Sequence, residues 1–109
     1  MAVEDAQALA ESLRFVAEKS QLSKAVRTYE DSRKARVSLM HQASYRHAYT
    51  VHLPDGVEQR ARDAGMADEV AGKHFIQSPN QWSDPTTQRW AYKHDPVADI
   101  QRAWRASHI

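Results

Sequence analysis

Histidines are the residues of this sequence best suited to hold a metal ion or to transfer protons. Two histidines four residues apart on a helix can bind one ion from the same face, and no pair here has that spacing. The chain also has no cysteine, which excludes thiolate zinc sites and disulfides. The sequence therefore predicts no metal site, and the histidines are expected at surfaces or interfaces: His41, His47, His52, His74, His94 and His108.

The sequence has few of the motifs that are typical of covalent catalysis or phosphate binding. His94 and Asp95 could form a catalytic dyad, but Asp95 stands directly before Pro96, where a capping carboxylate is expected. No Gly-x-Ser-x-Gly nucleophile elbow is present. None of the glycines, at positions 56, 65 and 72, follows a strand and opens a helix, as a phosphate-binding loop requires.

A small-ligand pocket is the remaining chemical possibility. Three tryptophans, at positions 82, 90 and 104, could form an aromatic cage, although packing of the loop against helices is the favoured interpretation. The residues that combine polar groups with aromatic neighbours are the candidate pocket residues. They are Tyr45, His47, Tyr49, His52 and Trp82. The alternative, in which they are ordinary packing and surface groups, stays open.

The composition limits the kind of protein this can be. Fifteen basic and fourteen acidic residues nearly cancel, which argues against a nucleic-acid or membrane-surface partner. No apolar run is long enough for a membrane span or a signal peptide, so a cytoplasmic location is expected. Seventeen of the apolar residues are alanines, which bury little area. The composition suits helices packed on a larger partner better than a self-sufficient core.

The elements that position these residues are predicted to be helices. Apolar residues repeat every three or four positions from Val3 to Ala17, which predicts a helix from Ala2 to Lys19 with no capping residue before it. The segment KSQLSK interrupts the pattern. From Ser23 to Tyr49 there is no glycine or proline, and one long central helix is expected.

The second half of the chain is predicted from its prolines and turn residues. HLPDG ends the long helix, and a third helix follows from about Val57 to Val70. GKHFIQSPNQWSDP is expected to be an irregular loop. Pro85 and Pro96 suit the first turns of the last helices, capped by Ser83 or Asp84 and by Asp95. We therefore predict an all-α fold of three to five helices, with residues 1–109 as a single helical domain or segment.

Four segments of the chain form a pattern in a fixed order. They are MAVEDAQALAESL, YEDSRKAR, HLPDGVEQRARDAGMA and NQWSDPTTQRWAYKHDPVADIQRAW. Together they resemble the C-terminal helical region of FAD-dependent aromatic monooxygenases, most closely the fungal salicylate hydroxylase-like enzymes, and YEDSRKAR is similar to that family's Tyr-Glu-x-x-Arg-x-x-Arg helix. Ala35 and Val57 depart from the pattern, because the family often has proline at these positions.

The resemblance implies a parent enzyme that uses FAD, reduced by NADH or NADPH, to hydroxylate an aromatic ring. In the family, a flavin-binding loop leads into a helix like the first one here, so Met1 is expected to correspond to an internal position of a longer pattern. The Gly-x-Gly-x-x-Gly fingerprint, the acidic ribose-binding residue and the Gly-Asp motif have no counterpart in these residues. No flavin-binding or catalytic residue can be transferred, and no cofactor is expected for the chain alone.

Two functional hypotheses follow. In the first, the chain is the helical segment of a flavoprotein hydroxylase, without redox activity by itself. In the second, it is a stand-alone, flavin-less helical protein, either an interaction module or a non-redox enzyme with a hydrophobic pocket. Both leave apolar helix faces exposed, so self-association or docking on a flavoprotein domain is expected. Whether the chain is itself an enzyme stays open.

Overall fold

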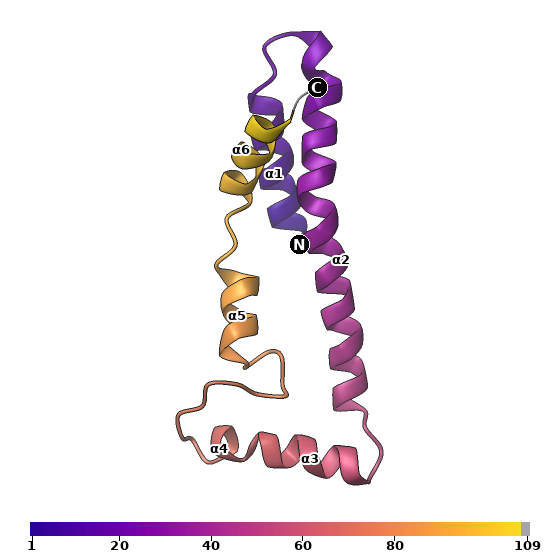
Figure 1. Ribbon diagram of the computed structural model, residues 1–109, viewed down its shortest axis with the longest axis vertical. Helices are drawn as coiled ribbons and strands as arrows, with labels where there is room; N and C mark the ends of the chain where they lie inside the picture. Colours follow the sequence, from indigo (N-terminus) through magenta and orange to yellow (C-terminus); the bar gives the residue numbers. More distant parts are fainter. Residues whose placement is uncertain (108–109) are drawn as a thin grey trace. The chain divides into compact units, whose positions relative to one another are not determined.

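The computed structural model describes residues 1–107, and all regular elements of this part are helices (Figure 1). This confirms the all-α prediction. His108, one of the six histidines, lies outside the described residues. No helix in the described part is long and apolar enough to cross a membrane. The elements are α1 (Ala2–Arg14), η1 (Lys19–Gln21), α2 (Leu22–Val51), α3 (Val57–Gly65), α4 (Ala67–Val70), α5 (Pro85–Tyr92) and α6 (Pro96–Ala106).

Helix α1 ends at Arg14 rather than at the predicted Lys19. The cause is a local competition for backbone hydrogen bonds. The side-chain oxygen of Gln21 accepts hydrogen bonds from the backbone N–H groups of Ala17 (2.7 Å) and Glu18 (3.1 Å). These N–H groups are therefore satisfied without the helical carbonyl acceptors, and the chain leaves α1 and continues into the short 3₁₀ helix η1.

The predicted third helix is divided at Met66 into α3 and α4, so the described residues form six α-helices rather than the predicted three to five. Gly65, which has low helix propensity, stands at this break. It also has a packing role, because a Cβ atom there would lie 3.0 Å from Cγ of Pro79. The absent side chain lets the loop after α4 approach α3 closely.

The long central helix and the two carboxylate caps are confirmed. Helix α2 runs without interruption and ends three residues before Pro54. Asp84 caps α5 by accepting a hydrogen bond from Thr87 N at 3.1 Å. Asp95 caps α6 by accepting from Val97 N (3.0 Å) and Ala98 N (3.1 Å), which confirms the cap interpretation of this residue.

The chain forms two compact units, residues 1–40 with 95–107, and residues 41–94. In the first unit α1 packs on α6 (Figure 1), with Ala8, Ala25 and Ile100 completely buried. Ile100 is the one large apolar side chain that is fully buried in the described part. In the second unit no residue between positions 41 and 94 is buried. This unit therefore has no core of its own in the usual sense.

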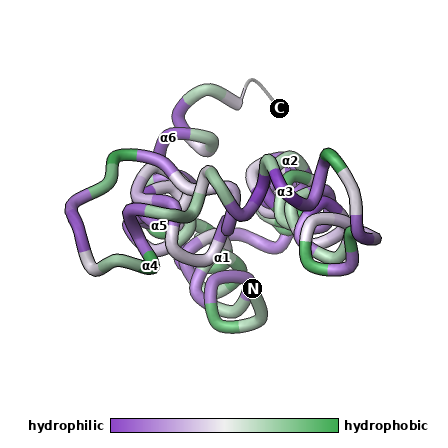
Figure 2. The backbone as a smooth tube through the Cα atoms, turned by 90° about the horizontal axis from the view of Figure 1, so that it is seen from below, coloured by the Kyte–Doolittle hydropathy of each residue, from purple (hydrophilic) through white to green (hydrophobic). Residues whose placement is uncertain are grey.

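Helix α1 turns small and polar side chains toward the rest of its unit. The Ser12 hydroxyl donates to the carbonyl oxygen of Ala25 at 2.5 Å, and Ser12 is completely buried. The apolar stripe predicted from the sequence stays on the outside: Val3 is 74% exposed and Leu13 is 42% exposed. Figure 2, coloured by hydropathy, shows hydrophobic and hydrophilic stretches alternating along the turns of α1.

Candidate functional site

One open pocket lies entirely within residues 41–94 and has a volume of about 450 Å³. Three segments form it: the end of α2, helix α3 with the residue after it, and the loop before α5. Its volume is in the range of small-molecule sites. The lining residues are His47, Thr50, Val51, Arg62, Asp63, Met66, Asn80 and Trp82.

His47 and Trp82 meet in this pocket. Their ring centroids are 5.4 Å apart and the planes stand at 78°, an edge-to-face arrangement that aromatic rings favour. The Nδ1 atom of His47 is buried and has no hydrogen-bond partner among the described residues. The indole of Trp82, by contrast, is 55% exposed. A partly exposed indole ring thus contacts an imidazole that has an unsatisfied polar atom.

The two charged residues of the pocket neutralise one another. Arg62 donates from Nε (3.0 Å) and Nη2 (2.9 Å) to one carboxylate oxygen of Asp63, and from Nη1 to the carbonyl oxygen of Thr50 (2.8 Å). Gln59 donates to the other Asp63 oxygen at 3.1 Å. The guanidinium therefore braces the end of α2 against α3 and leaves no net charge in the pocket.

The structure places two of the five predicted pocket residues in the lining, His47 and Trp82. Tyr45 is 79% exposed and does not line it. The Tyr49 hydroxyl donates to Glu58 at 2.5 Å, and this hydrogen bond to a carboxylate raises the pKa of Tyr49 above its usual value. The His52 ring is hydrogen-bonded through Nδ1 to the Ala48 carbonyl oxygen (2.8 Å) and does not line the pocket.

Sequence reasoning missed the contribution of α3 and of Asn80. Positions 47, 50 and 51 follow the i, i+3, i+4 spacing of one helix face, and positions 62 and 66, four residues apart, share a face of α3 and the residue after it. This spacing was the available signal in the sequence, but the local sequence does not indicate that the face of α2 contacts the face of α3. The contact depends on the reversal at Pro54–Gly56.

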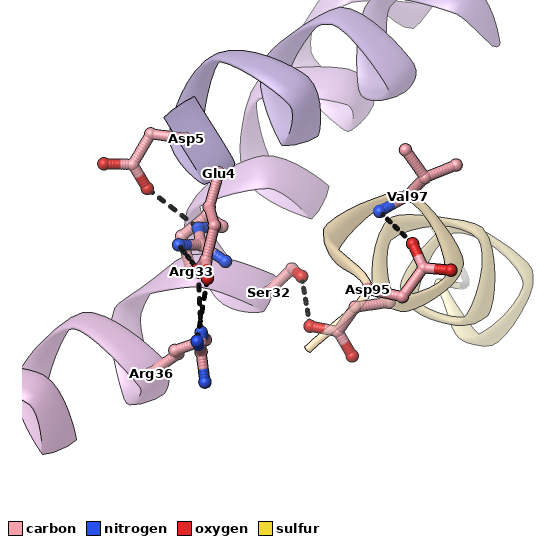
Figure 3. A network of polar contacts seen from close by, with 8 residues as sticks. Glu4, Asp5, Ser32, Arg33, Arg36, Asp95 and Val97 are labelled. Atoms are coloured by element: carbon pink, nitrogen blue, oxygen red, sulfur yellow. Dashed lines mark hydrogen bonds and ion pairs between the residues drawn. The ribbon is translucent and has the colours of Figure 1, made fainter. Parts of the chain in front are cut away.

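The second notable cluster is an ion-pair network in the other unit (Figure 3). Glu4 accepts from Arg36 Nε and Nη2, both at 2.8 Å, and from Arg33 Nη2 at 2.9 Å. Arg33 Nε also donates to Asp5 at 2.8 Å. The hydrogen bonds from Arg36 lower the pKa of Glu4 to about 2, against the opposing effect of burial and with help from Arg33. These groups hold α1 on α2, and the lowered pKa makes Glu4 unsuited to proton transfer near neutral pH.

Other polar and aromatic candidates have structural roles. Trp104 stacks on Phe15 with ring centroids 5.0 Å apart, and Lys24 Nζ lies 4.1 Å from the Trp104 centroid, so this tryptophan packs within its own unit. Ser32 donates to Asp99 of α6 at 2.8 Å. Within residues 1–107 no three histidine, aspartate or glutamate side chains gather in the way a metal ion requires.

Comparison with known proteins gives two matches to one kind of enzyme. The FAD-dependent monooxygenase OpS4 of Beauveria bassiana (strain ARSEF 2860) is 32% identical over 97 residues, which is 89% of this chain. The FAD-dependent monooxygenase atnJ of Arthrinium sp is 48% identical over 63 residues, or 58% of this chain. The chain is related in sequence to fungal FAD-dependent monooxygenases.

The relationship covers a small part of those enzymes. The chain spans 22% of the length of OpS4 and 15% of atnJ. No family model and no solved structure matches the chain. The resemblance noted from the four sequence segments is thus confirmed, and the activity of a whole enzyme remains a matter for proposal.

The N-termini of α1, α3, α5 and α6 do not fit the diphosphate of FAD. Such a group is usually held by free N–H groups at a glycine-flanked helix N-terminus. Four of the longer helices instead place carboxylates there: Glu4 and Asp5 in α1, Glu58 in α3, and the caps Asp84 and Asp95 of α5 and α6. These carboxylates would repel a diphosphate and already accept hydrogen bonds at two of the sites.

Proposed function

We propose that this chain is the helical segment of an FAD-dependent aromatic monooxygenase, and that it packs on the flavin-binding part instead of binding flavin itself. The observation that carries this proposal is the match of 89% of the chain to OpS4, an enzyme described as FAD-dependent. The chain's own helix N-termini, with their carboxylates, support the second half of the proposal.

The distribution of apolar side chains supports a packing role. Sixteen large apolar or aromatic side chains are exposed in the described part of the chain. No residue from 41 to 94 is buried. Exposed apolar surface of this extent marks a contact with another protein surface. We assign the outer face of α1, with Val3, Leu9 and Leu13, to the contact with the flavin-binding part, and expect isolated chains to self-associate through it.

The division of labour follows from these contacts. When bound, reduced flavin supplies the oxygen chemistry of such enzymes. The residues of this chain supply rigid packing: the Glu4–Arg33–Arg36 network joins α1 to α2. Arg33 and Arg36 are the arginines of the YEDSRKAR segment, so that pattern is explained as a structural brace, and both are almost completely buried.

A flavin titration and a chimaera test this function. The isolated chain is expected to bind no FAD by flavin fluorescence. A chimaera of OpS4 that carries this chain in place of the matching 97 residues is expected to retain flavin and NADH or NADPH oxidation. A matched chimaera with Leu9→Ser and Leu13→Ser is expected to lose solubility or flavin. Tight FAD binding by the chain alone, or equal behaviour of the two chimaeras, would contradict the proposal.

The second candidate is a stand-alone, flavin-less helical protein. It is favoured by one observation: the ion-pair network and the 450 Å³ pocket are each complete within this chain. Such a protein would act as an interaction module or as a non-redox enzyme. A sharp, reversible thermal transition of the isolated chain supports this candidate, because a segment that depends on a partner melts without cooperativity.

A further inference from the structure

We infer that the pocket between His47 and Trp82 is a binding site for an uncharged ring compound that carries a hydroxyl or carbonyl oxygen. The site uses only residues between positions 47 and 82 of this chain. It does not rest on the relation to flavoenzymes. The argument has three steps, which concern the apolar walls, the free polar groups and the charge.

The walls are suited to a flat, apolar body. Val51 of α2 and Met66 at the end of α3 line the pocket with aliphatic surface, and Trp82 lines it with an indole ring. A ring compound stacks on indole and contacts the methionine sulfur favourably. A space of about 450 Å³ holds a compound of one or two fused rings. Because Trp82 is 55% exposed, its ring has room to adjust to such a compound.

Two polar side chains are available to an oxygen substituent. The buried Nδ1 of His47 has no hydrogen-bond partner among residues 1–107, a state that folded proteins usually avoid. Ligand binding requires the indole that contacts the imidazole to shift, so that the ligand reaches this atom. Asn80 uses its side-chain oxygen to accept from Trp82 N at 3.2 Å, which leaves its amide N–H groups as donors.

The charge of the lining selects against ions. Arg62 is held by Asp63 and by the Thr50 carbonyl oxygen, and Asp63 is held in addition by Gln59. A carboxylate or sulfonate ligand would have to displace Asp63 from Arg62, and an ammonium group would have to displace Arg62 from Asp63. An uncharged compound needs neither exchange. We therefore assign the pocket to neutral phenols and hydroxyketones.

The first test uses the whole chain and 2-naphthol, which is uncharged near neutral pH, as phenols are. In ¹H–¹⁵N spectra, shift changes are expected at Val51, Met66 and the Trp82 indole N–H. Naphthalene-2-sulfonate, the anion of the same shape, is expected to bind about tenfold more weakly. Changes centred elsewhere, equal affinity for the sulfonate, or an undispersed spectrum for residues 47–82 would overturn the proposal.

Matched variants distinguish binding in the pocket from nonspecific binding elsewhere on the chain. His47→Phe keeps a ring but removes the nitrogen, and about five- to tenfold weaker 2-naphthol binding is expected, the value of one hydrogen bond. Trp82→Ala is expected to weaken binding by about tenfold or more. His52→Phe and Trp90→Ala change the same residue types outside the lining and are expected to stay within about twofold. Equal losses in the controls, or none at His47 and Trp82, would refute the site.

Discussion

The carboxylate of Glu4 is the group whose removal tests the structure of the first unit most directly. It accepts hydrogen bonds from both Arg33 and Arg36, whose side chains are 4% and 6% exposed, while its own side chain is 21% exposed. The change Glu4→Gln preserves the size of the side chain and removes the charge. The substitution removes the α1 carboxylate that pairs with two nearly buried guanidinium groups of α2.

The expected loss of stability follows from the pKa of Glu4. A lowering of the pKa from 4.5 to about 2 corresponds to roughly 3 kcal/mol of preference for the charged form in the folded chain. Because the side chain retains some contact with water, we expect Glu4→Gln to lower the free energy of unfolding by about 2 kcal/mol near neutral pH. The pKa is depressed on folding, so this contribution is present above about pH 5 and is lost as pH falls toward about 2.

Urea unfolding followed by far-ultraviolet circular dichroism, repeated over this pH range, measures the effect. The gap between wild type and Glu4→Gln is expected to shrink steadily as the pH is lowered. Glu11 and Asp84 also have lowered pKa values and add to the acid sensitivity of both proteins, so the difference between the two isolates Glu4. Glu30→Gln, at an exposed position of α2, is the control. A gap below about 0.5 kcal/mol, or one that does not change with pH, would refute the ion-pair argument.

Two further substitutions test the packing and capping of α6. Ile100→Ala removes the one large apolar side chain that is fully buried in the described residues, and a loss of about 3 kcal/mol in the free energy of unfolding is expected. A loss near zero would show that α6 does not pack on α1. Asp95→Ala removes the hydrogen bonds to Val97 N and Ala98 N and is expected to cost about 1 kcal/mol, whereas Asp95→Asn, which can still cap, is expected to cost less than half of that. Equal losses for Ala and Asn would contradict the capping role. Urea unfolding measures both.

Local interactions explain why much of the helix pattern could be predicted. Pro54 ends α2, and Pro85 and Pro96 begin α5 and α6, because proline cannot donate an N–H group and fits the first helical turn. Asp84 and Asp95 cap these helices within three residues of their own positions. Interactions of such short range depend only on neighbouring residue types, so the helix ends that they determine can be predicted from the sequence.

The end of α1 and the break at Met66 show the limit of such predictions. The residues after Arg14 have a helical pattern of apolar positions. The Gln21 side-chain oxygen nevertheless accepts hydrogen bonds from the N–H groups of Ala17 and Glu18, which then do not continue the helix. At Gly65 the close approach comes from Pro79, fourteen residues further along the chain. Contacts of this kind are not visible in a local pattern, and helix propensity differences are too small to fix a helix boundary alone.

The sequence by itself determined the helical class, the long central helix, the capping carboxylates and the relation to FAD-dependent monooxygenases. Each of these depends on periodicity, on residues within a few positions of one another, or on similar segments in the same order. Only the tertiary structure decided which face of α1 turns inward and which residues share the pocket with His47 and Trp82. Glu4 meets Arg33 and Arg36 across about thirty residues, and Arg62 meets Thr50 across a chain reversal. Such contacts arise from the meeting of two surfaces, and no local pattern states which surfaces meet.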